Sequence, residues 1–85
     1  MSYRIEFKPS ATRALRGLSK DTQRRLSPKI NALAENPRPH GVEKLSGEEN
    51  LYRIRVRDYR IIYQIRDKVL LVLVVHVGHR REVYR

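Results

Sequence analysis

The chain combines segments in which apolar residues recur at helical spacing with segments in which they alternate with polar residues. Residues 2–7 alternate Tyr3, Ile5 and Phe7 with polar neighbours, which predicts a strand. A helix is predicted to open at Pro9-Ser10, because the next apolar residues fall at helical spacing: Ala11, Ala14, Leu15 and Leu18. The N-terminal part therefore predicts a strand followed by a helix.

A second helix is predicted after a break at residues 17–19. Ser19 suits the N-cap position and Pro37 suits a stop, so the helix is expected to run to Asn36. Pro28 lies inside this segment and removes a backbone donor, so we expect a kinked or restarted helix rather than a loop. Its apolar residues share one face: Leu26, Ile30 and Leu33.

The second half of the chain is strand-like. Residues 51–57, 59–66 and 69–78 are rich in β-branched and aromatic residues, which predicts three strands. Arg57-Asp58 and Asp67-Lys68 separate them as expected tight hairpin turns. Before them, a linker at residues 36–41 leads to a short strand at residues 42–46 and a turn. The element order is β-α-α-β-β-β-β within a single domain, residues 1–85.

The first hairpin predicts two different faces. If Arg57-Asp58 is the turn, Val56 pairs with Tyr59 and Arg55 lies opposite Arg60. One face then forms a core for the helices: Tyr52, Ile54, Val56, Tyr59, Ile61, Tyr63 and Ile65. The other face carries Arg53, Arg55 and Arg60. Like charges directly opposite destabilise a sheet, so this face favours a phosphate-binding surface, with a solvated outer face as the plainer alternative.

The second hairpin extends this map. With Asp67-Lys68 as the turn, Arg60 pairs with Val75, Ile62 with Leu73 and Gln64 with Leu71. The arginine face then has an apolar end that either binds a partner or is covered by the protein's own helix or tail: Leu51, Ile62, Leu71, Leu73 and Val75. The same register places His76 beside Tyr59 on the core face and His79 toward the arginine face.

The amino-acid composition strengthens the expectation of an anionic partner. The chain has 19 Lys and Arg against 9 Asp and Glu, a net charge of +10, which favours a polyanion or an acidic protein. It has no cysteine, which excludes disulfides and thiolate metal sites, and its three histidines make a poor case for zinc. No apolar signal core or membrane-spanning run is present, so a cytoplasmic protein with no membrane partner is expected.

The C-terminal residues 77–85, VGHRREVYR, suit RNA, because arginines hold phosphates and a tyrosine can stack on an unpaired base. A frayed basic tail is the plainer alternative. Together with LYRIRVRDYRIIYQI and VVHVGHRREVY, the chain resembles the RelE toxins of the RelE/ParE superfamily along essentially its whole length. The resemblance implies an α+β fold with two N-terminal helices packed on a curled, mainly antiparallel β-sheet.

The resemblance also implies an activity. RelE-like toxins are endoribonucleases that cut mRNA in the ribosomal A site by attack of the 2′-hydroxyl on the adjacent phosphate, without a metal or other cofactor. The family's catalytic residues match Arg53, Arg55, Arg60, Arg80 and Tyr84, and the RNA-binding arginines further include Arg57 and Arg81. Well-characterised members have lysine at positions 53 and 55. Because arginine effectively keeps its proton, we expect His79 to perform proton transfer, with Tyr84 stacking or relaying a proton.

The implied partners are the ribosome, mRNA and a cognate antitoxin, with operator DNA bound only through the antitoxin. The apolar end of the arginine face is the expected antitoxin site. Two rival functions remain open: a ParE-like toxin that targets DNA gyrase, and a non-catalytic RNA- or DNA-binding relative.

Overall fold

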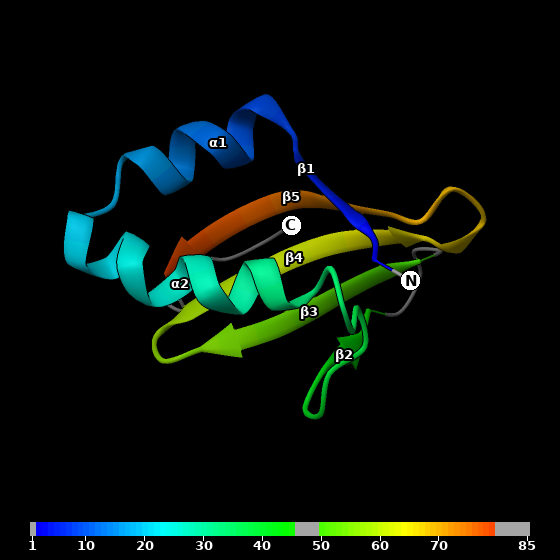
Figure 1. Cartoon of the computed structure of the whole chain (residues 1–85). Helices are drawn as coiled ribbons and strands as arrows, with labels where there is room; N and C mark the ends of the chain where they lie inside the picture. Colours follow the sequence, from blue (N-terminus) through cyan, green and yellow to red (C-terminus); the bar gives the residue numbers. More distant parts are fainter. Residues whose placement is uncertain (1, 46–49, 80–85) are drawn as a thin grey trace.

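The computed structural model describes residues 2–45 and 50–79, and it consists of two helices packed on one face of a five-stranded sheet (Figure 1). The helices are α1 (Pro9–Arg16) and α2 (Lys20–Ala32). The strands are β1 (Arg4–Phe7), β2 (Glu43–Lys44), β3 (Leu51–Val56), β4 (Tyr59–Arg66) and β5 (Leu71–His79). This arrangement confirms the predicted fold and element order.

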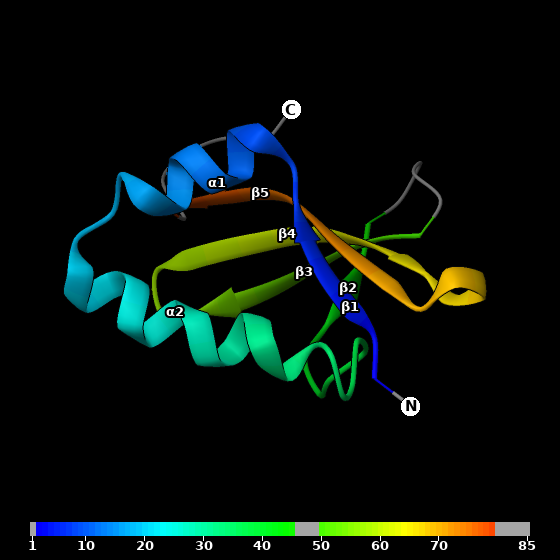
Figure 2. The ribbon, with the colours of Figure 1, turned by 45° about the horizontal axis from the view of Figure 1, so that its top comes forward.

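The sheet has the strand order β1-β5-β4-β3-β2. Strand β1 pairs in parallel with β5, and the other neighbours pair antiparallel, so the sheet is mixed but mainly antiparallel. Both helices lie on the same side of it, which leaves the opposite side, called here the outer face, free of helices (Figure 2). No helix in residues 2–45 or 50–79 is long and apolar enough to cross a membrane.

Helix α2 begins where the sequence predicts and ends earlier. The Ser19 hydroxyl accepts a hydrogen bond from the Thr22 backbone N–H at 3.1 Å, which confirms the N-cap. The helix continues past Pro28 and ends at Ala32, before the predicted Asn36. The turn after it is tighter, since the backbone N–H of Leu33 donates to the carbonyl three residues earlier.

The core lies between the helices and the sheet. The predicted core face of β3 and β4 is confirmed: six of its residues are buried, and Tyr59 packs against them. Leu26 and Ile30 from α2, and Leu33 just after it, belong to the same cluster. Tyr63 is fully buried, and its hydroxyl donates to the Pro37 carbonyl oxygen at 2.7 Å. Burial raises the pKa of Tyr63, so its hydroxyl stays protonated.

The β3–β4 hairpin has the predicted register. Val56 pairs with Tyr59, and Arg55 lies opposite Arg60. The turn residue Arg57 adopts a left-handed conformation, φ +54°. Because two residues suffice to close this hairpin, the alternation of its side chains could be followed from the turn.

The β4–β5 hairpin differs from the prediction. Its connection is longer, because Asp67–Val69 form a 3₁₀ turn (η1) and Leu70 is left-handed, φ +50°. Gln64 therefore lies opposite Leu73 instead of Leu71. A register shift between Ile62 and Tyr63 then moves the pairing by one further residue.

That one-residue shift reverses two predicted placements. Arg60 lies opposite Gly78 rather than Val75, and Ile62 lies opposite His76 rather than Leu73. His76 consequently shares the outer face with Arg60, and the prediction that it lies on the core face was wrong. His79 pairs with Tyr59 instead, and the two rings meet edge to face at 5.3 Å. The placement of His79 toward the arginine face was wrong for the same reason.

The far end of the sheet is tied together by three side chains, here called the clasp: Tyr3, Arg38 and Asp67. The Tyr3 hydroxyl donates to Asp67 Oδ1 at 2.6 Å, and Arg38 donates two hydrogen bonds to the same carboxylate at 3.2 and 2.9 Å. The guanidinium of Arg38 also lies over the Tyr52 ring, 5.3 Å from its centroid. Hydrogen bonds from Arg38 and then Tyr3 lower the pKa of Asp67 to about 2.

Candidate functional site

The outer face carries a basic cluster at the β3–β4 end, here called the arginine face: Arg53, Arg55, Arg60 and His76. Arg55 and Arg60 are direct cross-strand neighbours. Ile62 lies between Arg53 on β3 and His76 on β5, because it pairs with both. Neighbouring strands are about 4.8 Å apart, so the backbones of Arg53 and His76 are separated by roughly 10 Å. Ile62 itself is buried, with 1% of its surface exposed.

An acidic residue that the sequence did not point to sits beside two of these arginines. Glu43 on β2 pairs with Arg53 in the sheet and accepts a hydrogen bond from its Nη2 at 3.1 Å. Its other carboxylate oxygen lies 3.8 Å from Arg55 Nε. Glu43 thereby offsets part of the positive charge of Arg53 and Arg55, whereas the like-charged pair Arg55 and Arg60 is the one expected to hold an anion. The only signal for it was the short strand predicted at residues 42–46.

Two guanidinium nitrogens of the arginine face lack an acceptor within the described part of the chain. Arg53 Nε and Arg60 Nε are buried and donate no hydrogen bond to any described residue. A buried donor without an acceptor costs roughly 1–3 kcal/mol. Arg60 also lines a small cavity of about 100 Å³ together with Arg55, Arg57 and Tyr59. A phosphate oxygen that enters this cavity would reach the side chain of Arg60.

The structure brings together part of the predicted site. Arg53, Arg55 and Arg60 share one face, and Arg57 follows at the adjacent turn. The predicted proton-transfer residue His79 lies on the other side of the sheet, whereas His76, which we had interpreted as structural, lies on the arginine face. Three further predicted residues fall outside the described residues: Arg80, Arg81 and Tyr84.

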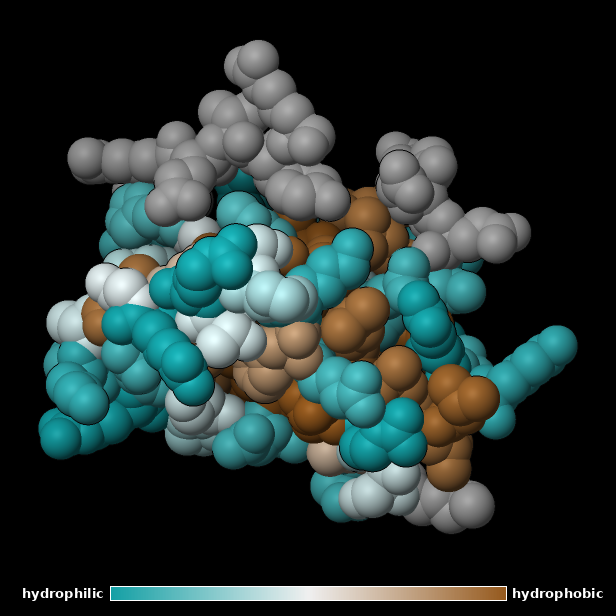
Figure 3. Space-filling view, turned by 90° about the horizontal axis from the view of Figure 1, so that it is seen from above, coloured by the Kyte–Doolittle hydropathy of each residue, from teal (hydrophilic) through white to brown (hydrophobic). Residues whose placement is uncertain are grey.

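The predicted apolar end of the arginine face is largely covered. Leu51, Ile62 and Leu71 are buried, and Leu73 and Val75 are half-buried. Seen from the side of α1 and β1, hydrophobic and hydrophilic side chains are interspersed over the surface (Figure 3). The role of these five residues in antitoxin binding stays a prediction.

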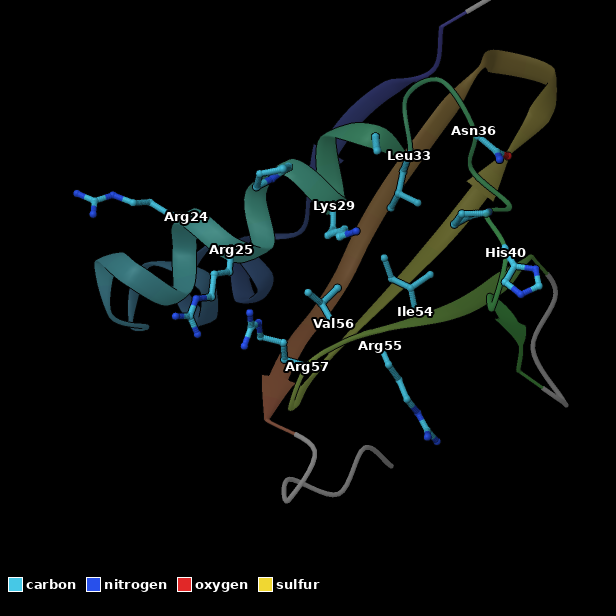
Figure 4. Close-up of a pocket in the computed structure, with 13 residues that line it drawn as sticks. Arg24, Arg25, Lys29, Leu33, Asn36, His40, Ile54, Arg55, Val56 and Arg57 are labelled. Atoms are coloured by element: carbon cyan, nitrogen blue, oxygen red, sulfur yellow. The ribbon is translucent and has the colours of Figure 1, made fainter.

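A larger concavity lies between α2 and the free edge of β3, here called the α2–β3 groove. It has a volume of about 820 Å³ (Figure 4). Strand β2 pairs only with Tyr52 and Arg53, so residues 54–56 of β3 border the groove. One stripe of α2 and the turn after it form the opposite wall: Arg24, Arg25, Pro28, Lys29, Ala32, Leu33 and Asn36. Sequence reasoning missed this groove, because the early end of α2 and the shortness of β2 leave it open.

The fold of this chain is shared with toxins of bacterial and archaeal toxin–antitoxin systems. The family model described as ParE toxin of type II toxin-antitoxin system, parDE, matches residues 5–84. The mRNA interferase toxin RelE of Escherichia coli K12 is 34% identical over 88 residues, which cover 99% of this chain and 92% of that protein. The chain therefore belongs to the RelE/ParE toxin family and is a RelE-like type II toxin.

Solved structures agree with this assignment. The isolated E. coli RelE toxin has a TM-score of 0.84 and 30% identity, and the match covers 96% of this chain and 88% of that chain. RelE in the archaeal RelE–RelB complex of Pyrococcus horikoshii OT3 has a TM-score of 0.83 and 31% identity, with coverage of 98% and 100%. RelE in the intact E. coli RelBE toxin–antitoxin complex has a TM-score of 0.83 and 30% identity, with coverage of 99% and 100%.

Proposed function

We propose that this toxin is a metal-independent endoribonuclease that cuts mRNA in the ribosomal A site and so inhibits translation in the cytoplasm. The observation that carries the proposal is the arginine face, on which Arg53, Arg55 and Arg60 converge and two buried guanidinium nitrogens have no acceptor within residues 2–45 and 50–79. The name of the E. coli relative, mRNA interferase toxin, supports RNA as the substrate.

The reaction would be an internal transfer of the phosphodiester. The 2′-oxygen forms a bond to phosphorus while the bond from phosphorus to the 5′-oxygen breaks, which leaves a 2′,3′-cyclic phosphate and a 5′-hydroxyl. Negative charge grows on the phosphate oxygens in the transition state. Arg53, Arg55 and Arg60 are placed to stabilise this charge, and arginine forks suit phosphate oxygens. The incoming phosphate competes with Glu43 for Arg53 and Arg55.

The same reaction needs a group that takes a proton from the 2′-hydroxyl and one that returns a proton to the 5′-oxygen. Arginine cannot be the acceptor, because it keeps its proton in proteins. Histidine exchanges protons between pH 5 and 8. We assign the acceptor role to His76, which lies across Ile62 from Arg53 on the same face. His79 stays the rival candidate from the sequence, with Arg80 and Tyr84 completing the proposed catalytic set.

The proposed partners are the translating ribosome with its mRNA and a cognate antitoxin, as in the RelE–RelB complexes of the related toxins. The net charge of +10 favours approach to ribosomal RNA, and Arg57 and Arg81 are expected to add phosphate contacts. Operator DNA would be bound only through the antitoxin.

Primer extension on an mRNA in translating ribosomes tests this proposal. Purified toxin should produce new 5′ ends at A-site codons, and these should vanish with Arg80→Ala and with Arg60→Ala. Arg66→Ala is a matched control, because Arg66 lies on the same face of the same strand but at the far end. Ribosome binding without cleavage would indicate a binding module, and inhibition of gyrase supercoiling without cleavage would favour the ParE-like function.

A further inference from the structure

The main chain of β2 holds Glu43 at the edge of the arginine face. Glu43 pairs with Arg53 in the sheet, and just beyond it the backbone N–H of Leu45 donates to the Leu51 carbonyl oxygen at 2.9 Å. These main-chain contacts place the carboxylate beside the arginines whether or not an ion pair forms. A substitution that changes only the charge of this side chain should therefore leave β2 in place.

The contacts that Glu43 makes with the arginines are weak enough for another anion to replace. One carboxylate oxygen accepts a hydrogen bond from Arg53 Nη2 at 3.1 Å, and the other lies 3.8 Å from Arg55 Nε, too far for a hydrogen bond. The Glu43 side chain is 50% exposed, so solvent weakens both ion pairs. The Asp67 carboxylate in the clasp, by contrast, accepts three hydrogen bonds.

An RNA phosphate that binds Arg53 and Arg55 has to displace Glu43. A phosphodiester and a carboxylate each carry one negative charge, and they compete for the same guanidinium donors. Because the carboxylate is attached to the chain beside the arginines, it competes at a high effective concentration and weakens RNA binding. This loss arises when RNA binds and persists unchanged in the transition state, so it raises KM and leaves kcat the same.

We propose that Glu43 is a specificity-determining residue that keeps free RNA off the arginine face. Free RNA binds only through its own contacts with the toxin, whereas mRNA in the A site is presented together with further contacts from the ribosome. The competing carboxylate therefore suppresses the weaker of the two interactions and leaves the stronger one in place. The inference rests on the proposed function, because it takes RNA to be the anion that this face binds.

The first test measures RNA binding by the full-length toxin without ribosomes. The probe is a fluorescein-labelled single-stranded RNA of ten nucleotides with 2′-O-methyl groups, which lack the attacking hydroxyl and so cannot be cleaved. Its affinity is measured by fluorescence anisotropy at 150 mM salt. Glu43→Gln keeps the size of the side chain and removes its charge, and it should tighten binding about fivefold or more.

Glu6→Gln is the matched control. Glu6 accepts a hydrogen bond from Arg4 at 2.8 Å, its side chain is also 50% exposed, and it lies on β1 at the opposite edge of the sheet. Its neighbours Ile5 and Phe7 pack on the core, so Glu6 faces the outer side as Glu43 does. The change in net charge is the same, but salt screens it from the arginine face, so binding should tighten less than about twofold.

A double substitution locates the effect. In a toxin that already carries Arg53→Ala, Glu43→Gln should change RNA affinity less than about twofold, because the hydrogen-bonded partner of the carboxylate is gone. In a toxin that carries Arg55→Ala, the hydrogen bond between Glu43 and Arg53 remains, so the effect of Glu43→Gln should persist.

Cleavage kinetics on translating ribosomes give the second readout. Glu43→Gln should lower KM about fivefold and change kcat less than about twofold. A residue that merely held the arginines in position would instead lower kcat when substituted. The binding measurements contain no ribosome, so they decide the role of Glu43 even if the wild-type toxin cuts no mRNA.

Three results would overturn the proposal. Unchanged or weaker RNA binding by Glu43→Gln would show that this carboxylate does not compete with phosphate. Equal tightening by Glu6→Gln would show that only the net charge matters. A full effect of Glu43→Gln in the Arg53→Ala background would show that the carboxylate acts elsewhere than at the arginine face.

Discussion

The two ends of the sheet both carry charged side chains, but they differ in whether the hydrogen-bonding groups of these side chains have partners. At the end near η1, the carboxylate of Asp67 accepts hydrogen bonds from Tyr3 and from both terminal nitrogens of Arg38. At the β3–β4 end, Arg55 faces Arg60 across the sheet, and the Nε atoms of Arg53 and Arg60 are buried without an acceptor in the described part of the chain. The clasp is a completed network, whereas the arginine face is an incomplete one.

This difference separates stability from function. The clasp joins Tyr3 to Asp67, which are 64 residues apart, and so it fixes the N-terminal strand and the linker to the sheet. Among the described residues the arginine face makes no comparable connection, and the buried donors without an acceptor there carry a cost in the free protein. Substitutions in the clasp should therefore change folding, and substitutions on the arginine face should change activity.

The largest expected effect is that of Arg60→Ala on cleavage. Loss of a side chain that stabilises transition-state charge should lower the rate of mRNA cleavage about 100- to 1,000-fold. The same change removes a buried, unpaired donor and a like charge opposite Arg55, so the midpoint of urea unfolding should stay the same or rise. Cleavage kinetics and urea titrations measure the two quantities. A large loss of stability would show instead that Arg60 stabilises the fold.

The two histidines of β5 lie on opposite faces of the sheet, and substituting each of them tests which face carries the proton acceptor. His76→Gln should lower cleavage about 100-fold or more, as expected for a general base. Cleavage rates of the wild type and the variant on the same ribosomes measure this effect.

His79→Gln is the matched control for this experiment, since it changes the same side chain three residues away on the other side of the sheet. If His79→Gln loses cleavage and His76→Gln keeps it, the sequence-based choice of His79 was the right one.

How far the sequence could predict this site depends on how each hairpin is closed. The Arg57-Asp58 turn adds no extra residue, so strict alternation placed Arg53, Arg55 and Arg60 correctly. The other hairpin has a 3₁₀ turn, a left-handed Leu70 and a shift at Ile62, none of which has a clear sequence signal. A shift by one residue exchanges the faces, and this alone moved His76 onto the arginine face.

Side-chain contacts between distant parts of the chain could not be predicted from the sequence either. The partners of Asp67 are Tyr3, just before β1, and Arg38 in the linker, and no local pattern connects them. Glu43 could be assigned to a short strand, but its contact with Arg53 and Arg55 depends on the edge position of β2. Periodicity predicts which side chains share a face of one element, whereas pairing between distant elements depends on the packed core.

A smaller effect is expected from glycine at two of the left-handed positions. Arg57 and Leu70 have φ of +54° and +50°, which costs an L-residue about 1 kcal/mol relative to glycine. Arg57→Gly and Leu70→Gly should each raise the free energy of unfolding by up to about 1 kcal/mol in urea titrations. Arg57→Gly should also weaken RNA binding, whereas Leu70→Gly should not. Equal RNA affinities would mean that Arg57 does not contact the substrate.

The smallest expected effect is a loss of stability at acid pH, which comes from Asp67 in the clasp. Asp67 has a pKa of about 2 in the folded protein, because Arg38 and Tyr3 donate hydrogen bonds to it, whereas its ordinary value is 3.8. A carboxyl with a lowered folded pKa adds stability above its unfolded pKa, and this contribution disappears as the pH falls through the folded value. The urea midpoint of the wild type should therefore exceed that of Asp67→Asn by a constant amount above about pH 5, and the difference should shrink towards pH 2.

Asp21→Asn is the control, since Asp21 makes an exposed pair with Arg25 outside the clasp. A difference between wild type and Asp67→Asn that does not change between pH 5 and 2 would show that the clasp acts through packing rather than through the charge of Asp67.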